Sequence, residues 1–206
     1  MIMNIENIKA KIKNRDSKLE GKYNRFSILV PIVKVNDELE LLLEVRSETL
    51  NVQPNEICFP GGKIEKNESP YECSIRETCE ELNIYPSDIE VFGALDYLVL
   101  PSNLLLYPYL GNINCNVEDI KFSKDEVSTI FTVPLKHFID HPPLEHSIDL
   151  KVHMGKDFPY DLIQDGINYN WRTGKYPVLF YKYKDYIIWG ITARIIKNLV
   201  DLLKNL

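Results

Sequence analysis

The sequence lacks the features that define several classes of protein. No stretch approaches 18 uninterrupted apolar residues, so a transmembrane helix is not expected. The N-terminal segment has no long apolar run, which argues against a secretory signal peptide. Basic residues are not in excess, because 24 Lys and Arg stand against 30 Asp and Glu. Proteins that bind nucleic acid usually carry a basic excess, so a nucleic-acid partner is not expected.

Cysteine motifs are also missing. The four cysteines, Cys58, Cys73, Cys79 and Cys115, show no C-x-x-C spacing. In a chain of this length they are typical of reduced, mostly buried thiols, and they predict a cytoplasmic protein. His137 and His141 have helical spacing, but a zinc site would need further ligands. With 45% hydrophobic and 26% charged residues, the 206-residue chain has the composition of a globular domain with a substantial core.

Apolar patterns predict a mixed order of strands and helices. Isoleucines at three- and four-residue intervals from Ile2 to Ile12 indicate an amphipathic N-terminal helix. Strands are predicted at 26–35, 39–47, 89–100, 104–113, 149–154, 176–183 and 186–190, with a short strand and glycine turn at 56–62 and helices at 70–82, 134–140 and 191–206. This order fits an α/β fold with a mixed sheet between helices, in which residues 1–25 lead into a single domain over 26–206.

The helix predicted over 70–82 carries end signals. Ser69 is a good N-cap, Pro70 suits the first helical position, and Glu72 completes a capping box. Asn83 follows where a helix ends on a left-handed residue. At 100° per residue, the face expected to meet the core holds Tyr71, Ile75, Thr78, Cys79 and Leu82, and the opposite face holds Arg76, Glu77, Glu80 and Glu81.

Three glutamates crowd the end of this helix. Glu77 faces Glu80 and Glu81 one turn later, and each like-charge pair costs ~0.2–0.5 kcal/mol. The helix dipole disfavours anions near its C-terminus by a further ~0.3–1 kcal/mol each. A solvated acidic face is the simple interpretation. A divalent cation such as Mg²⁺, which takes carboxylate oxygens, is the alternative that offsets the repulsion.

The spacing of the whole stretch resembles the Nudix box, G-x5-E-x7-R-E-U-x-E-E-x-G-U with U aliphatic. The matching residues are Gly62, Glu68, Arg76, Glu77, Glu80, Glu81 and Ile84, whereas Thr78 and Asn83 depart from the pattern. The resemblance implies a Nudix-type α/β/α sandwich with a mixed central sheet and a pyrophosphohydrolase that uses Mg²⁺ or Mn²⁺. It implies metal on Glu77 and Glu81, with Glu80 as a further ligand or a base. It also implies that Glu68 and Arg76 orient the loop and that Gly61 and Gly62 bring backbone close to the substrate.

The segment before the box resembles the signature of the coenzyme A pyrophosphatase branch, LLTxRSxxLxxHxGxVxFPGG. Matches are Leu42, Leu43, Arg46, Ser47, Leu50, Phe59, Pro60, Gly61 and Gly62, whereas Glu44, Gln53 and Asn55 replace Thr, His and Gly. The implied substrate is coenzyme A or an acyl-CoA, cut to 3′,5′-ADP and (acyl-)4′-phosphopantetheine. Arg46 and Ser47 are then phosphate contacts, although a surface salt bridge would also explain Arg46.

Some roles stay open at this point. Glu126 is either a first-turn helix acid or an additional carboxylate that binds metal or activates water, so the general base is Glu80 or Glu126. Trp171, Arg172, Tyr176 and Trp189 would suit base stacking or a phosphate contact, but aromatics in strands are more often core. The rival functions are a Nudix enzyme for ADP-ribose, NADH or another nucleoside diphosphate, and a non-catalytic nucleotide-binding module. The expected partner is a small molecule, not a membrane, and the sequence leaves room for a homodimer.

Overall fold

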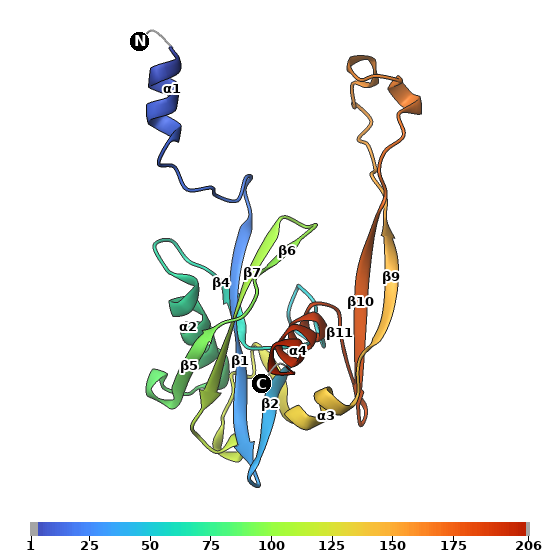
Figure 1. Cartoon of the computed structure of the whole chain (residues 1–206). Helices are drawn as coiled ribbons and strands as arrows, with labels where there is room; N and C mark the ends of the chain where they lie inside the picture. The colour runs from blue at the N-terminus through green and yellow to red at the C-terminus, as the bar shows by residue number, and fades with distance from the viewer. Residues whose placement is uncertain (1–3, 205–206) are drawn as a thin grey trace.

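The computed structural model describes residues 4–204 (Figure 1). Its helices are α1 (Ile5–Ile12), α2 (Pro70–Leu82), α3 (Leu135–Asp140) and α4 (Gly190–Leu203), with 3₁₀ turns at Pro86–Asp88, Val117–Asp119, Tyr160–Leu162 and Gly166–Asn168. Its strands are β1 (Asn24–Val35), β2 (Glu38–Arg46), β3 (Ile57–Cys58), β4 (Gly61–Lys63), β5 (Ile89–Ala94), β6 (Leu98–Leu100), β7 (Leu104–Ile113), β8 (Val127–Pro134), β9 (Leu144–Leu150), β10 (Gly174–Tyr183) and β11 (Tyr186–Trp189). The order of elements makes this a mixed α/β protein.

The central sheet has eight strands and is mixed. Its main path runs β3-β2-β1-β7-β5, with β4 paired to β1, β6 to β7 and β8 to β2. Strands β1 and β7 are parallel, whereas their other neighbours are antiparallel. Strand β1 lies at the centre, and the turn that carries Gly61 and Gly62 pairs directly against it. The sheet therefore fixes the position of the glycine turn.

Both faces of the central sheet are buried, because successive residues of a strand point to opposite sides. One face packs Leu29, Val33 and Leu42 under α2. The other face packs Val30 and Leu43 toward α4, whose Ile196 and Leu199 are fully buried. Figure 1 shows α2 on one side of the sheet and α3 with α4 on the other. These layers form the expected α/β/α sandwich.

A second sheet with the order β11-β10-β9 adjoins the α4 side. Strands β9 and β10 form a long antiparallel arm that rises beside the central sheet, and its tip holds the 3₁₀ turns Tyr160–Leu162 and Gly166–Asn168 (Figure 1). Strand β11 runs directly into α4, so the arm and the last helix are tied to each other.

Several predicted elements are confirmed, and others need correction. The predicted 89–100 strand is two strands, β5 and β6, because the β5–β7 register shifts between Val91 and Gly93 and residues 95–97 belong to neither strand. The strand predicted at 149–154 is wrong in position: β9 ends at Leu150, where its pairing with β10 ends. Helix α1 is confirmed, although its isoleucines are exposed and Ile2 lies outside the described residues. The division of the chain at residue 25 stays a prediction.

Candidate active site

Helix α2 is turned so that part of its acidic face meets the protein. The predicted caps are confirmed, because Ser69 and Glu72 form the capping box and Asn83 is left-handed at φ 51°. Its buried residues are Cys73, Ser74, Thr78, Glu81 and Leu82, whereas Tyr71 is exposed. The prediction that Glu81 faces away from the core is therefore wrong, because its exposed fraction is only 4%.

Short side chains explain this orientation of α2. The hydroxyls of Ser74 and Thr78 donate to helix carbonyls, at 2.8 Å to Tyr71 O and 2.7 Å to Ser74 O. Their hydrogen bonds are thereby satisfied, so both residues are buried at little cost and the helix approaches β1 closely. The N-terminus of α2 is fixed there too, since Ser27 Oγ on β1 donates to Pro70 O at 2.6 Å.

The glycine turn covers the carboxylates on this face. The backbone N–H of Gly61 donates to Glu81 Oε2 at 2.7 Å. Gly61 has φ +154°, and a Cβ there would lie 2.6 Å from Ile28 Cα, so glycine is required. A Cβ on Gly62 would fall on the carboxylate of Glu77. The two glycines thus let the backbone lie directly against Glu77 and Glu81.

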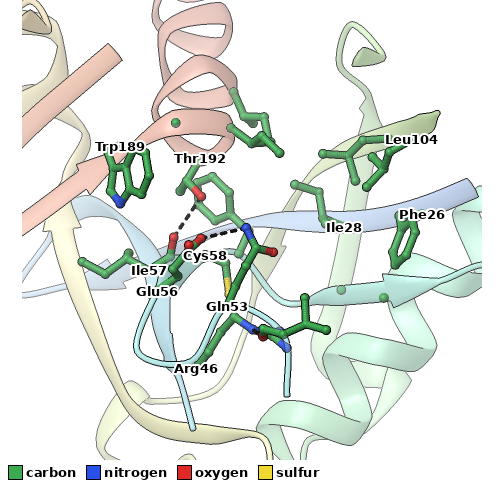
Figure 2. A pocket seen from close by; sticks show the side chains of 18 of the residues that line it. Phe26, Ile28, Arg46, Gln53, Glu56, Ile57, Cys58, Leu104, Trp189 and Thr192 are labelled. Atoms are coloured by element: carbon green, nitrogen blue, oxygen red, sulfur yellow. Dashed lines mark hydrogen bonds between the residues drawn. The ribbon is translucent and has the colours of Figure 1, made fainter. Parts of the chain in front are cut away.

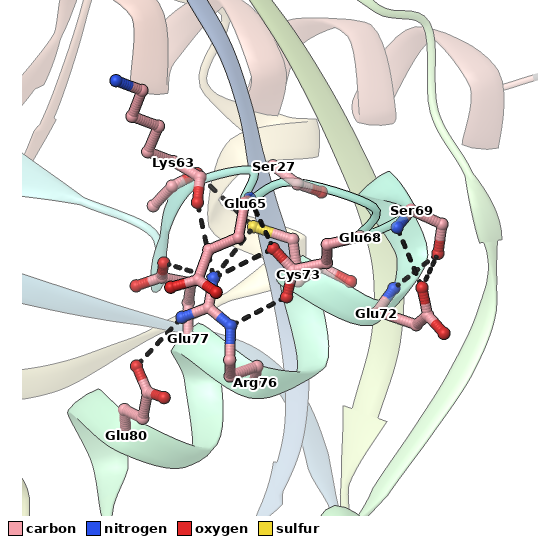
Figure 3. A network of polar contacts seen from close by, with 12 residues as sticks. Ser27, Lys63, Glu65, Glu68, Ser69, Glu72, Cys73, Arg76, Glu77 and Glu80 are labelled. Carbon is pink, nitrogen blue, oxygen red and sulfur yellow. Dashed lines mark hydrogen bonds and ion pairs between the residues drawn. The ribbon is translucent and has the colours of Figure 1, made fainter.

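Arg76 fixes the loop between β4 and α2 onto the helix (Figure 3). It makes a bidentate contact with Glu68, at 2.7 Å from Nε to Oε1 and 3.1 Å from Nη2 to Oε2. Glu68 Oε2 also accepts from Glu65 N at 2.8 Å. The Arg76 hydrogen bond is the largest influence on Glu68 and lowers its pKa to about 2. Arg76 reaches Glu77 at 2.8 Å and Glu80 at 3.0 Å as well.

A pocket of about 710 Å³ opens beside the glycine turn (Figure 2). Its polar lining includes Arg46, Gly61, Gly62, Glu77, Glu81 and Glu126. One apolar wall comes from the central sheet and α4: Phe26, Ile28, Leu104, Leu106, Ile191 and Ile195. Further apolar lining comes from the arm and its neighbours: Ile148, Tyr176, Val178 and Trp189. One pocket therefore joins a cluster of carboxylates to a long apolar surface.

Two predicted site residues do not reach this pocket. Ser47 is buried, its Oγ lies 2.9 Å from Thr49 Oγ1, and its N–H donates to Glu126 O at 2.8 Å. It therefore supports the loop that carries Glu126 instead of facing a substrate. Glu80 is 57% exposed and paired with Arg76, because it lies on the far side of α2 from the sheet. The structure thus separates Glu80 from Glu77 and Glu81.

Of three further residues predicted to contact the substrate, two line the pocket and one does not. Tyr176 and Trp189 line the pocket, whereas Arg172 lies near the tip of the arm, outside the lining. Trp189 also stacks on Phe180, with the two ring planes 8° apart. The Tyr176 ring, in turn, has the Arg194 guanidinium over it, with Cζ 5.0 Å from the ring centroid.

Glu44 is a site residue that the sequence analysis did not select. It is 1% exposed in the middle of β2, opposite Cys58 of β3 in the strand register. The Cys58 thiol lines the pocket and donates to Glu44 Oε1 at 3.3 Å. A lone carboxylate within the apolar run of residues 41–45 was the available signal.

Burial and mutual repulsion disfavour the ionised forms of these carboxylates. Burial, followed by the charge of Glu44, raises the pKa of Glu81 to about 9. Burial also raises the pKa of Glu44 to about 7, and it raises the pKa of Glu77 even though Arg76 opposes the shift. The charge of Glu126 adds to all three shifts. The site therefore brings together several carboxyl groups whose ionised forms are destabilised.

Comparison with known proteins identifies the family. The NUDIX domain model matches residues 25–152, more than half of the chain. The chain belongs to the Nudix family. It is 31% identical over 174 residues to the peroxisomal coenzyme A diphosphatase NUDT7 of Mus musculus, covering 80% of this chain and 72% of that protein. It is 29% identical over 179 residues to the Nudix hydrolase NudL of Escherichia coli K12, covering 86% and 81%.

Solved structures agree on the fold. A MutT/nudix family protein from Enterococcus faecalis superposes with a TM-score of 0.50 at 16% identity, over 98% of this chain and 70% of that one. At this identity the likeness concerns the fold alone. The Nudix domain and its hydrolase relatives make this protein a pyrophosphohydrolase.

The donor groups of the site suit a hard divalent cation. Nudix hydrolases generally use divalent metal ions. Within residues 4–204 no three His, Cys, Asp or Glu side chains already meet in a metal-binding arrangement. However, the pocket presents carboxylate oxygens, and Glu44 Oε2 is a buried oxygen without a hydrogen-bond partner among those residues. Carboxylates are the ligands that Mg²⁺ and Mn²⁺ prefer, so the residues present fit such an ion.

Proposed function

We propose that this Nudix enzyme hydrolyses the diphosphate of coenzyme A or an acyl-CoA, giving 3′,5′-ADP and (acyl-)4′-phosphopantetheine. The observation that carries the proposal is the single pocket in which Arg46 and the carboxylates adjoin a long apolar surface. Such a pocket suits a substrate with a charged diphosphate and a long, weakly polar arm. The similarity to a protein named as a coenzyme A diphosphatase supports the same choice.

The ends of the substrate would meet different parts of the pocket. Arg46 lines the pocket, and its guanidinium suits phosphate oxygens because it presents several donors in one plane. Among the two arginines considered from the sequence, Arg172 lies outside the lining, so Arg46 is the proposed phosphate contact. The pantetheine arm would lie along Ile191 and Ile195 of α4, and Tyr176 or Trp189 would stack on the adenine.

The metal-binding residues follow from the carboxylates around the glycine turn. Glu77 and Glu81 are the proposed ligands of Mg²⁺ or Mn²⁺, because both line the pocket. When bound, the ion would neutralise phosphate charge and lower the pKa of a bound water. Glu80 is now proposed to hold Arg76, not the ion, since it is exposed and ion-paired. Glu68 and Arg76 would keep the glycine turn against α2.

Glu126 is the proposed general base. It lines the pocket, whereas Glu80 does not. In the hydrolysis step its carboxylate would take a proton from water. The water oxygen would form a bond to one phosphorus, and the bridging oxygen would leave with the other phosphate. Ser47 would hold the Glu126 backbone through its N–H contact.

A substrate panel tests this function. The purified protein is incubated with Mg²⁺ or Mn²⁺ and coenzyme A, an acyl-CoA, 3′-dephospho-CoA, ADP-ribose or NADH, and the products are separated. A charge-assisted phosphate contact is worth ~1.5–3 kcal/mol, so we expect coenzyme A to exceed 3′-dephospho-CoA in kcat/KM by roughly tenfold to 150-fold. Faster turnover of ADP-ribose or NADH than of every CoA species would overturn the proposed substrate but not the proposed hydrolysis of a diphosphate.

The cellular location and the oligomeric state of the enzyme stay predictions. A cytoplasmic location is expected from the sequence alone, and a homodimer is compatible with it. No helix among residues 4–204 is long and apolar enough to cross a membrane. Gel filtration with light scattering would test the dimer.

A further inference from the structure

Glu44 is a carboxylate buried inside the central sheet. Its exposed fraction is 1%, and it lies two residues from Leu42, on the face of β2 that packs toward α2. Oε1 accepts a hydrogen bond from the Cys58 thiol at 3.3 Å. Oε2 is also buried and has no hydrogen-bond partner in the described part of the chain. One carboxylate oxygen of Glu44 thus accepts a hydrogen bond, and the other accepts none from the described residues.

Such an oxygen is costly to bury. An ionised carboxylate in the interior needs a cation or several donors, and it is otherwise strongly destabilising. The nearest arginine in sequence, Arg46, directs its Nε to Val52 O at 3.4 Å. The salt bridges found within residues 4–204 do not include Glu44. Within the described residues this carboxylate therefore has no salt-bridge partner, and the charge of Arg46 lowers the pKa of Glu44 less than burial raises it.

The neighbours of Glu44 belong to the proposed catalytic pocket. Cys58, which pairs with Glu44 across β2 and β3, lines the pocket, and so does Glu81, which is itself 4% exposed. Glu81 Oε2 accepts from Gly61 N, so the Glu81 carboxylate is fixed by the glycine turn. Glu81 is thus a fixed buried carboxylate, and Glu44 is a second buried carboxylate with one oxygen that has no hydrogen-bond partner among the described residues. Carboxylate oxygens are the ligands that a hard divalent cation takes.

We propose that Glu44 is a further carboxylate of the divalent-cation site, with Oε2 serving the ion together with Glu81 and Cys58 holding Oε1. The inference rests on the metal dependence in the proposed function and deepens it. The coenzyme A pyrophosphatase pattern that this sequence resembles carries Thr at position 44, so the extra charge is a property of this chain. A site with one more carboxylate binds its ion more tightly, because ligand charge count tunes affinity.

Metal binding without substrate is the test. Mn²⁺ is titrated by calorimetry into wild type, Glu44→Gln and Glu44→Thr, and Tm is measured in EDTA and in saturating Mn²⁺. Glu38→Gln is the matched control, because Glu38 is an exposed glutamate on the same strand. We expect both position-44 variants to weaken Mn²⁺ binding by about 10- to 100-fold, the scale for groups that support a metal site. The Mn²⁺-induced rise in Tm should shrink in both variants and stay unchanged in Glu38→Gln.

The outcomes separate this inference from the proposed function. If wild type binds Mn²⁺ and both variants bind it equally well, Glu44 is only a buried structural acid and the inference fails. If wild type itself neither binds Mn²⁺ nor is stabilised by it, the metal dependence fails and takes the inference with it. Should Glu44→Gln fail to fold, Glu44→Thr gives the same comparison with a smaller side chain. Comparing Tm with and without Mn²⁺ within each variant removes any general loss of stability.

Discussion

The carboxylate of Glu77 lies in the space that a side chain on Gly62 would occupy. This relationship joins the glycine turn to helix α2, because β4 carries Gly62 and α2 carries Glu77. Arg76 holds the same carboxylate from the other side at 2.8 Å. Glu77 is thereby confined between a backbone surface and a guanidinium, so its position in the pocket depends on the absence of one carbon atom at residue 62.

Gly62→Ala should displace Glu77 and reduce hydrolysis. We expect kcat to fall by ~10²-fold or more, the scale for losing a preorganised electrostatic group. Steady-state kinetics on coenzyme A with Mg²⁺ measures this. Gly93→Ala is the control, because a Cβ at Gly93 meets no atom within 4 Å. Equal activity of the two variants would mean that the position of Glu77 is unimportant.

Glu81→Gln should reduce activity without reducing the stability of the metal-free protein. The neutral side chain still offers an oxygen to Gly61 N but loses the charge proposed to bind metal. We expect kcat to fall by ~10²-fold or more. Without metal at pH 8, Tm should not fall, because Glu81, whose pKa is raised to about 9 in the native state, must take up a proton on folding, whereas glutamine does not. Loss of folding in EDTA would show that the glutamate itself supports the fold.

The metal-free protein should lose stability as pH rises. Glu44 and Glu81 have pKa values raised from 4.5 to about 7 and about 9, so the native state binds more protons than the unfolded state above pH 4.5. The free energy of unfolding therefore falls as pH rises from about 4.5 through 7 toward 9. Thermal unfolding in EDTA at several pH values measures the decline, and Glu81→Gln should flatten its upper part. A Tm that rises steadily over this range would contradict the assignment.

Glu126→Gln should remove the general base. A base must be deprotonated to act, so kcat of the wild type should fall at low pH and this limb should vanish in the variant. The loss in kcat should be roughly 10²–10⁴-fold, with little change in Mn²⁺ affinity. Glu80→Gln, which alters an exposed partner of Arg76, should retain most activity. The reverse result would return the role of base to Glu80.

Local sequence was enough to predict helix α2 but not its orientation. Ser69, Glu72 and Asn83 define the helix ends through contacts within a few residues, so both ends are confirmed. The side of α2 that is buried depends on the distant glycine turn that covers Glu81. Apolar periodicity counts only hydrophobic residues, and it therefore assigned the buried Glu81 to solvent.

Some side-chain positions could not be predicted from the sequence pattern. Glu44 occupies a position that the coenzyme A pyrophosphatase pattern fills with Thr, and only the β2–β3 register shows that it faces Cys58. Ser47 matches that pattern, yet its hydroxyl turns toward Thr49. Helix α1 was correctly predicted, but its periodicity did not tell whether Ile5 and Ile8, both exposed, meet a core.

The pocket takes its two walls from different sheets. The carboxylates of Glu77 and Glu81 come from α2 and that of Glu126 comes from the loop before β8, whereas Tyr176, Val178 and Trp189 come from the sheet that includes the arm. Changes in the arm would alter the size and shape of the molecule that fits while leaving the reacting groups in place. Natural variation there would let substrate range diverge at constant chemistry, and a mutant library confined to residues 144–150 and 174–183 is the corresponding route for redesign.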